Sequence, residues 1–249
     1  QPTGNLGVLT TYTINATTGI KDLVGNSASA YTATFTTGTA QSLAVVSNVP
    51  SQPKDMVDLN GVVYFSAYLS GNGRNPWRSD GTAGGTSLMS VYVGYPWITG
   101  SDPKQFTRSG NYVYFEAYTD TYAGEVWRAN GSGASIFTDT SPGINGGFPK
   151  NLFDANGNFV ATGYTGDGYE RVYVNGSVLI SACYSCGSPG YYTMMGGLLY
   201  FTIGTDGNGA KLYRSDLTPA GTWMVAPPGA NTGGGFINTA AASTQLFGA

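Results

Sequence analysis

The chain has 249 residues, of which only 10% are charged, and its formal net charge at pH 7 is -3. Its 11 Lys and Arg residues are scattered, which excludes the basic stripe that a nucleic-acid-binding protein needs to displace counterions. The sequence contains no His, so both the commonest general base and the commonest metal ligand are missing.

The composition is typical of short strands joined by tight turns. Gly accounts for 38 residues, Tyr for 18, and aromatic residues make up 13% of the chain. Disordered chains combine high charge with few aromatics, so this composition indicates a folded protein. Gly together with many Tyr and Thr favours an all-β fold. No apolar run approaches the roughly 18 residues that a transmembrane helix needs, and we expect no membrane span.

The first 40 residues predict a β-hairpin. Residues 11–16 and 31–37 alternate between polar and apolar side chains, as half-buried strands do. The connection between them holds a Gly-x-x-Asp-x-x-Gly-Asn pattern at Gly19, Asp22, Gly25 and Asn26. This pattern resembles the closing hairpin of the bacterial Ig-like domain of surface-layer proteins. The resemblance implies a partial Ig-like segment over residues 1–40, followed by a linker over residues 41–52.

An internal repeat begins after this linker. A β-branched or aromatic run that ends in Tyr-Phe returns at intervals of about 40–50 residues, a period typical of propeller blades. The copies are residues 62–65, 112–115 and 198–201, with a weaker copy at 158–160. Each run follows a pair that suits the positive φ of a two-residue hairpin turn. These pairs are Asn60-Gly61, Gly110-Asn111, Asn156-Gly157 and Gly196-Gly197.

Each copy of the repeat predicts four short strands. In three copies a Pro-Lys pair starts the first strand, the Tyr-Phe run is the second, and a strand with Trp or Tyr is the third. Four strands in this length match a β-propeller blade. The predicted units are residues 53–94, 103–139, 149–182 and 191–226, and residues 234–249 repeat the start of a further unit.

The third strand carries the most specific motif. Residues 75–82 read Asn-Pro-Trp-Arg-Ser-Asp-Gly-Thr, and residues 125–132 read Glu-Val-Trp-Arg-Ala-Asn-Gly-Ser. Both resemble the bacterial repeat family named for the motif Glu-Leu-Trp-x-x-Asp-Gly-Thr, a propeller-like repeat of secreted and surface proteins with no defined activity. The resemblance implies an all-β, β-propeller-like array of about four four-stranded units, over residues 53–249, preceded by an Ig-like β-hairpin remnant.

Residues at equivalent positions of this motif predict structural roles. The third-strand aromatic is expected to fill the space between units, and the Arg that follows it to cover that ring or to bond a turn carbonyl. The motif residues are Trp77, Arg78, Asp80, Gly81, Trp127, Arg128, Tyr213, Arg214 and Asp216.

The two cysteines, Cys183 and Cys186, form a Cys-x-x-Cys pair. A c-type haem site would need His at position 187, where Gly187 stands, and a structural zinc site would need about four ligands. A redox pair of the thioredoxin kind belongs to a βαβ pattern, which is not predicted here. The favoured interpretation is a local disulfide in an oxidising compartment, with two free thiols as the alternative.

No cofactor or metal site is predicted, and calcium is the one ion for which the turns offer ligands. The densest groups of Asp, Asn and Gly are residues 206–209 and Asp167-Gly168. The sequence lacks the calcium loop of about twelve residues that closes with Glu. Plain turns are therefore the favoured interpretation, because Asp, Asn and Gly populate turns in any case.

Catalysis is the least favoured class of function, and we expect no enzyme. The chain has three Glu residues, Glu116, Glu125 and Glu170. A glycoside hydrolase needs two carboxylates that flank the bond it cleaves. Glu116 and Glu125 would have to face one pocket, with a raised pKa on one of them, for this activity.

The sequence favours a bacterial structural protein of the cell surface or the extracellular space. Both ends interrupt a pattern, which predicts a fragment of a longer chain or a subunit completed by its neighbours. Unpaired strand edges need cover, and a strand supplied by another copy or a neighbouring surface subunit would provide it. Repeated without closure, such pairing gives a filament.

The alternative is a secreted binding module for glycan or protein. This alternative requires loop aromatics that lie exposed in one cluster, because exposed aromatic patches mark binding surfaces. The candidate residues are Tyr92, Tyr95, Trp97, Tyr122 and Tyr191.

Overall fold

A computed structural model describes residues 10–37, 51–91, 100–131, 133–143, 145–182, 187–205 and 209–225 of the chain. Every helix or strand in these ranges is a β-strand. None of the described residues belongs to a helix with the length and hydropathy of a membrane span. The chain divides into two compact units, Gln1–Val45 and Val46–Ala249.

Unit 1 contains an antiparallel hairpin of β1 (Thr11–Ala16) and β2 (Tyr31–Thr36). Tyr12 pairs with Phe35 in this register, and the two rings stack with their centroids 5.6 Å apart. Because side chains alternate along a strand, the apolar residues share one face and the Thr and Asn residues share the other.

Asp22 organises the connection between these two strands. Its Oδ1 atom accepts hydrogen bonds from the backbone N–H groups of Val24 and Asn26, both at 2.9 Å. Its Oδ2 atom accepts a third bond from the side-chain amide of Asn26, also at 2.9 Å. The Asp-x-x-Gly-Asn part of the sequence pattern is therefore a turn held by the side chain of its own Asp.

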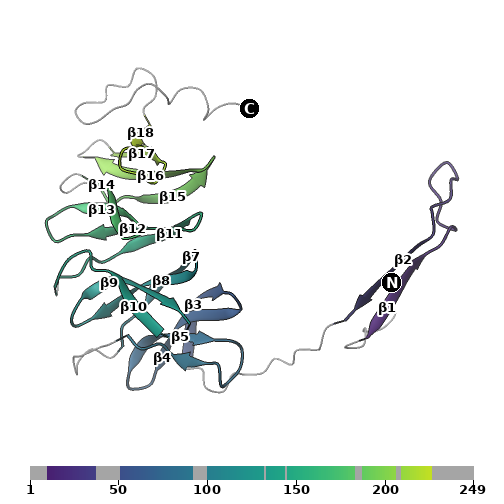
Figure 1. Cartoon of the computed structure of the whole chain (residues 1–249), viewed down its shortest axis with the longest axis horizontal. Helices are drawn as coiled ribbons and strands as arrows, with labels where there is room; N and C mark the ends of the chain where they lie inside the picture. The colour runs from purple at the N-terminus through teal and green to yellow at the C-terminus, as the bar shows by residue number, and fades with distance from the viewer. Residues whose placement is uncertain are drawn as a thin grey trace. The chain divides into compact units, whose positions relative to one another are not determined.

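Unit 2 consists of four antiparallel sheets, each a meander of four consecutive strands (Figure 1). Sheet 1 contains β3 (Ser51–Leu59), β4 (Val62–Leu69), β5 (Gly73–Ser79) and β6 (Ser87–Leu88). Sheet 2 contains β7 (Lys104–Ser109), β8 (Tyr112–Thr119), β9 (Ala123–Asn130) and β10 (Gly133–Thr138). Sheet 3 contains β11 (Lys150–Ala155), β12 (Asn158–Tyr164), β13 (Glu170–Val174) and β14 (Ser177–Ser181). Sheet 4 contains β15 (Gly190–Met195), β16 (Leu198–Thr205), β17 (Gly209–Ser215) and β18 (Thr222–Met224).

The all-β class and the repeated four-strand unit predicted from the sequence are confirmed by these sheets. All four share one register between their second and third strands. The paired residues are Phe65 with Trp77, Phe115 with Trp127, Ala161 with Tyr173, and Phe201 with Tyr213. The eroded third copy of the motif thus occupies the same position as the other three.

The four sheets follow one another in a row. Their first strands lie side by side, β3 next to β7, β7 next to β11, and β11 next to β15 (Figure 1). We call the face that each sheet turns toward the following sheet its front and the opposite face its back. Among the described residues no ring closes, so the propeller arrangement expected from the sequence is not seen in these sheets.

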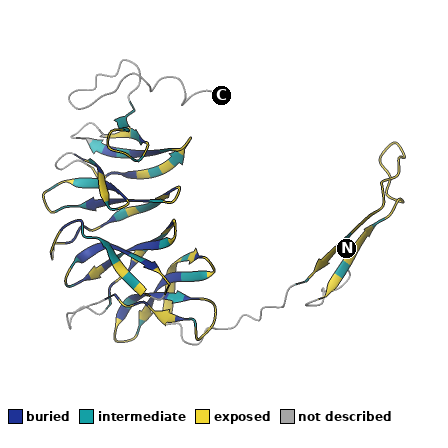
Figure 2. Cartoon of the chain, viewed as in Figure 1, coloured by how far each residue is buried: buried dark blue, intermediate teal, exposed yellow. Residues whose placement is uncertain are grey.

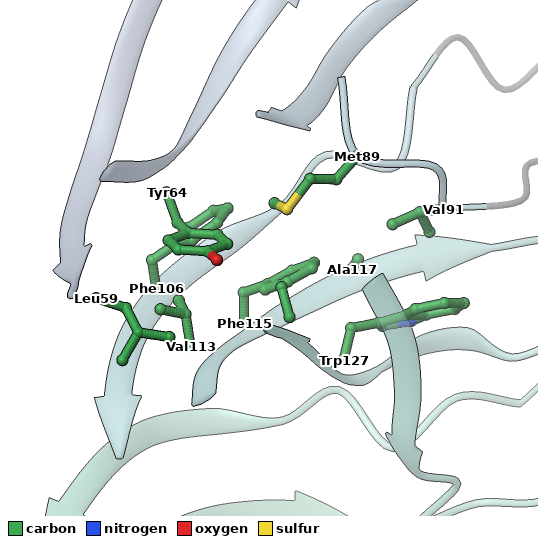
Figure 3. Packing of buried hydrophobic residues seen from close by; sticks show 10 residues of the cluster. Leu59, Tyr64, Met89, Val91, Phe106, Val113, Phe115, Ala117 and Trp127 are labelled. Atoms are coloured by element: carbon green, nitrogen blue, oxygen red, sulfur yellow. The ribbon is translucent and has the colours of Figure 1, made fainter. Parts of the chain in front are cut away.

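The hydrophobic core lies between successive sheets, where buried residues follow the strands (Figure 2). Tyr64 on the front of sheet 1 belongs to one buried cluster with Phe106, Phe115 and Trp127 on the back of sheet 2, and Tyr64 lies beside Phe106 (Figure 3). Between sheets 2 and 3 the core residues are Tyr114, Val126, Phe159 and Ala161. Between sheets 3 and 4 they include Val160, Val172, Leu199, Phe201 and Ile203. In these sheets the Tyr of a Tyr-Phe pair packs forward and the Phe packs backward, since neighbouring residues of a strand face opposite ways.

A β-bulge interrupts the first strand of every sheet. The residues with positive φ at this bulge are Asp55, Gln105, Asn151 and Tyr191, with φ of 55°, 58°, 55° and 55°. The side-chain amide of Gln105 donates to the carbonyl of Pro149, and that of Asn151 to the carbonyl of Pro189, both at 3.0 Å. In sheets 2 and 3 the bulge residue thus bonds to the chain just before the first strand of the next sheet.

Candidate functional site

The turn after the third strand is closed by the side chains of the motif itself. In sheet 1, Asp80 Oδ1 accepts hydrogen bonds from the N–H and the hydroxyl of Thr82, at 2.9 and 2.7 Å. Ser79 Oγ and Thr86 Oγ1 lie 2.6 Å apart across the same turn. The bonds from Thr82 hold the pKa of Asp80 below its usual value.

Sheet 4 repeats these hydrogen bonds at the equivalent positions. Asp216 accepts from the N–H and the hydroxyl of Thr218, at 2.9 and 2.6 Å, and the Ser215 and Thr222 hydroxyls are 2.7 Å apart. The Oδ1 atom of each Asp therefore accepts two hydrogen bonds within its own turn. The motif residues Asp80 and Asp216 serve the local fold, as turn-forming Asp residues do.

Two positions of this turn favour Gly, the one directly after the Asp and the one five residues after it. The residue after the Asp has positive φ, 89° at Gly81 and 73° at Leu217, so Gly is the unstrained choice there. A Cβ atom on Gly85 would lie 1.9 Å from Asp80 Oδ1, and one on Gly221 would lie 2.0 Å from Asp216 Oδ1. Only Gly at this position thus leaves room for the Asp carboxylate to lie against the backbone.

Substitution Gly85→Ala is expected to lower the free energy of unfolding by about 1–3 kcal/mol, because the Asp80 carboxylate must leave its donors. Gly84→Ala is the matched control, since a Cβ atom there meets nothing within 4 Å, and it should stay within about 0.5 kcal/mol of wild type. Urea denaturation measures both. Equal effects of the two substitutions would contradict this account of the turn.

The Arg position of the motif packs against aromatic rings on the front of its sheet. The Arg128 guanidinium lies 4.5 Å from the ring centroid of Tyr112 and 5.1 Å from that of Phe137. The Arg214 guanidinium lies 4.9 Å from the ring of Trp223. Neither arginine covers the preceding third-strand aromatic, because adjacent residues of a strand point to opposite faces. Arg78 pairs with Tyr64 in the equivalent register.

The two carboxylates considered for catalysis do not face one pocket. In the continuous register of β8 and β9, Glu116 pairs with Val126 and Ala117 pairs with Glu125. Directly paired residues point the same way and neighbours point oppositely, so Glu116 and Glu125 lie on opposite faces of sheet 2. The structure therefore does not bring together the pair that a glycoside hydrolase would need.

Glu125 is fully buried and holds a loop in place. Its carboxylate accepts hydrogen bonds from the N–H and hydroxyl of Thr140, at 3.0 and 2.9 Å, and from the N–H of Ser141 at 3.2 Å. Burial raises the pKa of this carboxyl, while the bonds from Thr140, Ser141 and the Gly147 backbone act against that rise. The residue ties the loop between sheets 2 and 3 to β9.

Glu116 is partly buried on the front of the same sheet. Its Oε2 atom accepts a hydrogen bond from the side-chain amide of Gln105 at 3.2 Å. Burial raises the pKa of Glu116, and the nearby Lys104 ammonium opposes the rise. Lys104 itself forms an ion pair with Asp102 at 3.1 Å.

The raised pKa of both Glu residues predicts a pH dependence of stability. A carboxyl whose pKa is higher in the folded state binds its proton more tightly there, so its contribution to stability is present at low pH and lost as pH rises through that pKa. We expect the urea midpoint to rise when pH falls from about 7.5 to about 5, and to rise less in Glu116→Gln. A midpoint that is unchanged or falls over this interval would exclude the effect.

Among the described residues, the loop aromatics proposed for binding do not form one exposed cluster. Tyr122 is partly buried and packs edge-on against Trp127, with ring centroids 6.4 Å apart. Tyr191 belongs to sheet 4 and is almost fully exposed. Tyr92, Tyr95 and Trp97 lie outside the described residues, as do Cys183 and Cys186 with their predicted disulfide.

A groove of ≈ 450 Å³ lies between sheets 1 and 2. Its lining comprises Asn75, Leu88, Met89, Ser90, Val91, Trp127 and Ala134. The indole N–H of Trp127 is buried and has no hydrogen-bond partner among the described residues. The indole N–H of Trp77, at the equivalent position of sheet 1, is likewise buried without a partner, so this is a property of the repeat position. Sequence reasoning missed this groove because it arises where two repeats meet.

In the part of the chain that the structure describes, no group of three or more acidic or cysteine side chains is placed to hold a metal ion. The Asp167-Gly168 turn singled out for calcium is closed internally. Asp167 Oδ2 accepts from Arg171 at 2.7 Å, and hydrogen bonds from Thr165 and Arg171 lower the pKa of Asp167 to about 2. The turn is thus held by an ion pair within the chain.

A comparison with protein-family models gave no match, and neither did a comparison with curated proteins.

Proposed function

We propose that this chain is a structural protein of the bacterial cell exterior whose copies join end to end into a filament or another surface assembly. The observation that carries the proposal is the contact between sheets, which unit 2 uses three times. Each contact places the front of one sheet on the back of the next. The two sides are different surfaces, and a contact of this kind can be repeated without limit unless it closes into a ring.

The repeat motif and the cysteines support an exterior location. Residues 75–82 and 125–132 resemble the repeat of secreted and surface proteins named for Glu-Leu-Trp-x-x-Asp-Gly-Thr, and residues 19–26 resemble the closing hairpin of a surface-layer Ig-like domain. A disulfide between Cys183 and Cys186 would fit an oxidising compartment. Mass spectrometry of the native chain without reductant tests this point, because free thiols at both positions would argue against it.

The front-to-back contact between successive sheets can continue in two ways, as a closed propeller-like ring or as an open row. A ring would place the front of sheet 4 on the back of sheet 1 within one chain, and an open row would place it on another copy. We propose the open row, because the first strands of the four sheets follow one another without returning to the first (Figure 1).

Negative-stain electron microscopy of the purified full chain tests the proposed function. Unbranched fibres of uniform width are the expected result at near-physiological salt. Isolated particles of single-chain size at every protein concentration would overturn the proposal of a self-assembling structural protein.

The second candidate is a binding module, which the groove at Trp127 favours. A glycan or peptide that fills it would make apolar contact with Leu88, which is 42% exposed. Leu88→Arg places a charge in this contact. If a glycan array identifies a ligand and this substitution abolishes its binding, the binding module becomes the favoured function.

A further inference from the structure

Sheet 2 differs from the other three sheets at three positions that lie close together in space. The first is Glu116, whose equivalents by register all carry a hydroxyl group, namely Ser66, Thr162 and Thr202. Each of those hydroxyls donates a hydrogen bond to a backbone carbonyl. Glu116 instead accepts one bond at Oε2, from Gln105, and its Oε1 atom has no hydrogen-bond partner among the described residues. This oxygen is available to a further donor.

The second position is Gly124, which lacks the side chain that its equivalents Arg74, Glu170 and Ala210 carry. A Cβ atom on Gly124 would lie 3.2 Å from Phe148 Cδ1 and 3.5 Å from Glu116 Oε1. The Phe148 ring and the Glu116 carboxylate therefore border the same point on β9. Gly at this position leaves room for the ring to lie against the strand.

The third position is Phe148 itself, which directly precedes Pro149 at the start of sheet 3. Its equivalents, each followed by Pro, are the polar residues Gln52, Asp102 and Ser188. Phe148 has a φ of 43°, in the left-handed region that Gln52 and Asp102 also occupy and that bulky residues rarely adopt. It is nevertheless 52% exposed. A strained and exposed aromatic in place of a polar residue points to a function.

The backbone next to Phe148 is held by hydrogen bonds to sheet 2. The N–H groups of Gly147 and Phe148 both donate to the carbonyl of Gly124, at 3.0 and 2.8 Å. The buried Glu125 carboxylate accepts bonds from Thr140 at the start of the same loop. The Phe148 ring is therefore presented in a fixed position, which lowers the entropy lost when a ligand binds.

Two more side chains complete this surface. Tyr118 pairs directly with Gly124, so it points to the same face as Glu116, and it is 40% exposed. Lys104 pairs with Glu116 on the neighbouring strand. Two exposed aromatic rings thus lie beside a carboxylate that accepts and an ammonium that donates hydrogen bonds. We call this set the sheet 2 patch, made up of Lys104, Glu116, Tyr118 and Phe148.

We infer that the sheet 2 patch binds a neutral pyranose sugar of a polysaccharide. A pyranose ring has an apolar C–H face, which fits an exposed aromatic ring such as that of Phe148. Its hydroxyl groups can donate to Glu116 Oε1 and accept from the Lys104 ammonium, and hydrogen bonds to charged groups are strong. The inference goes beyond the proposed function, because it does not depend on self-assembly.

The charges and the strand pairing of the patch narrow the choice of ligand. The carboxylates of Asp102 and Glu116 outnumber the ammonium of Lys104, which pairs with Asp102 at 3.1 Å. A uronic acid would therefore be repelled, whereas a neutral sugar would not. A peptide that adds to a sheet needs a free strand edge. Strand β8, which carries Glu116 and Tyr118, is paired on both sides by β7 and β9.

The repeat itself supplies test variants that should keep the fold. Phe148→Gln introduces the residue that has the same positive φ at position 52, and Glu116→Thr introduces the residue found in sheets 3 and 4. Each should weaken sugar binding at least about tenfold, because each removes a central contact. Tyr191→Ala is the matched control, since it removes an exposed aromatic with positive φ from another sheet. Circular dichroism shows that each variant is folded.

Saturation-transfer NMR of the full chain, followed by titration, measures the binding. The probes are soluble hexamers of glucose, mannose, N-acetylglucosamine and galacturonic acid. We expect transfer to at least one of the three neutral hexamers and none to the galacturonic acid hexamer. The signal should be lost in Phe148→Gln and Glu116→Thr and kept in Tyr191→Ala.

Three results would overturn the inference. The first is the absence of transfer to all three neutral hexamers, including the case in which only a peptide library binds at Phe148. The second is binding that survives in both patch variants or is abolished by Leu88→Arg alone, which would place the sugar in the groove between sheets 1 and 2. The third is tighter binding of galacturonic acid than of any neutral hexamer.

Discussion

Substitution Glu125→Ala is expected to lower the free energy of unfolding by about 3–5 kcal/mol. The carboxylate accepts two bonds from Thr140 and one from Ser141 in a fully buried site, and each buried donor left unpaired costs about 1–3 kcal/mol. The loop between sheets 2 and 3 should lose protection in amide hydrogen exchange. Urea denaturation and hydrogen exchange measure the two effects.

Glu116→Ala is the matched control for this prediction. Glu116 lies in the same sheet and accepts a side-chain hydrogen bond from Gln105 in a partly exposed site. Its loss should cost less than about 1 kcal/mol. If the two substitutions destabilise the chain equally, Glu125 does not hold the loop in the way described.

Substitution Phe115→Ala is expected to cost about 3–5 kcal/mol, the range for a large aromatic deleted from a packed core. Phe115 is fully buried and stacks on Phe106, with ring centroids 4.8 Å apart, between sheets 1 and 2 (Figure 3). In an array in which each sheet contacts only its neighbours, this loss also weakens the coupling of sheet 1 to the rest. Unfolding should therefore broaden or separate into two transitions.

Tyr118→Ala provides the comparison on the same strand. Tyr118 is exposed, and its removal should change the free energy of unfolding by less than about 1 kcal/mol. Urea denaturation of both variants measures the free energy of unfolding, and calorimetry shows whether unfolding occurs in one or two transitions. A single sharp transition in Phe115→Ala, with wild-type midpoint, would contradict the packing of sheet 1 on sheet 2.

Much of the fold could be predicted from the sequence because its determinants are local. Alternation over residues 11–16 and 31–37 anticipates β1 and β2, and pairs such as Asn60-Gly61 have the positive φ of hairpin turns. The recurrence of the Tyr-Phe run anticipates four equivalent sheets, including the third, where Ala161 replaces Phe.

What the sequence could not predict depends on contacts between repeats. Whether four sheets close into a ring depends on the angle between successive sheets, which side-chain packing sets and periodicity does not encode. The bulge at Gln105 and Asn151 is hidden because an extra residue in a strand has no sequence signature of its own. The role of Glu125 was missed because its donors belong to a loop whose path is fixed only by tertiary structure.

Sedimentation velocity of the wild-type chain over a hundredfold range of concentration tests the central claim of head-to-tail assembly most directly. The account predicts species at whole multiples of the chain mass, whose average size grows with concentration and has no preferred end point. A single species of one chain mass at every concentration, or one closed oligomer of fixed size, would contradict it.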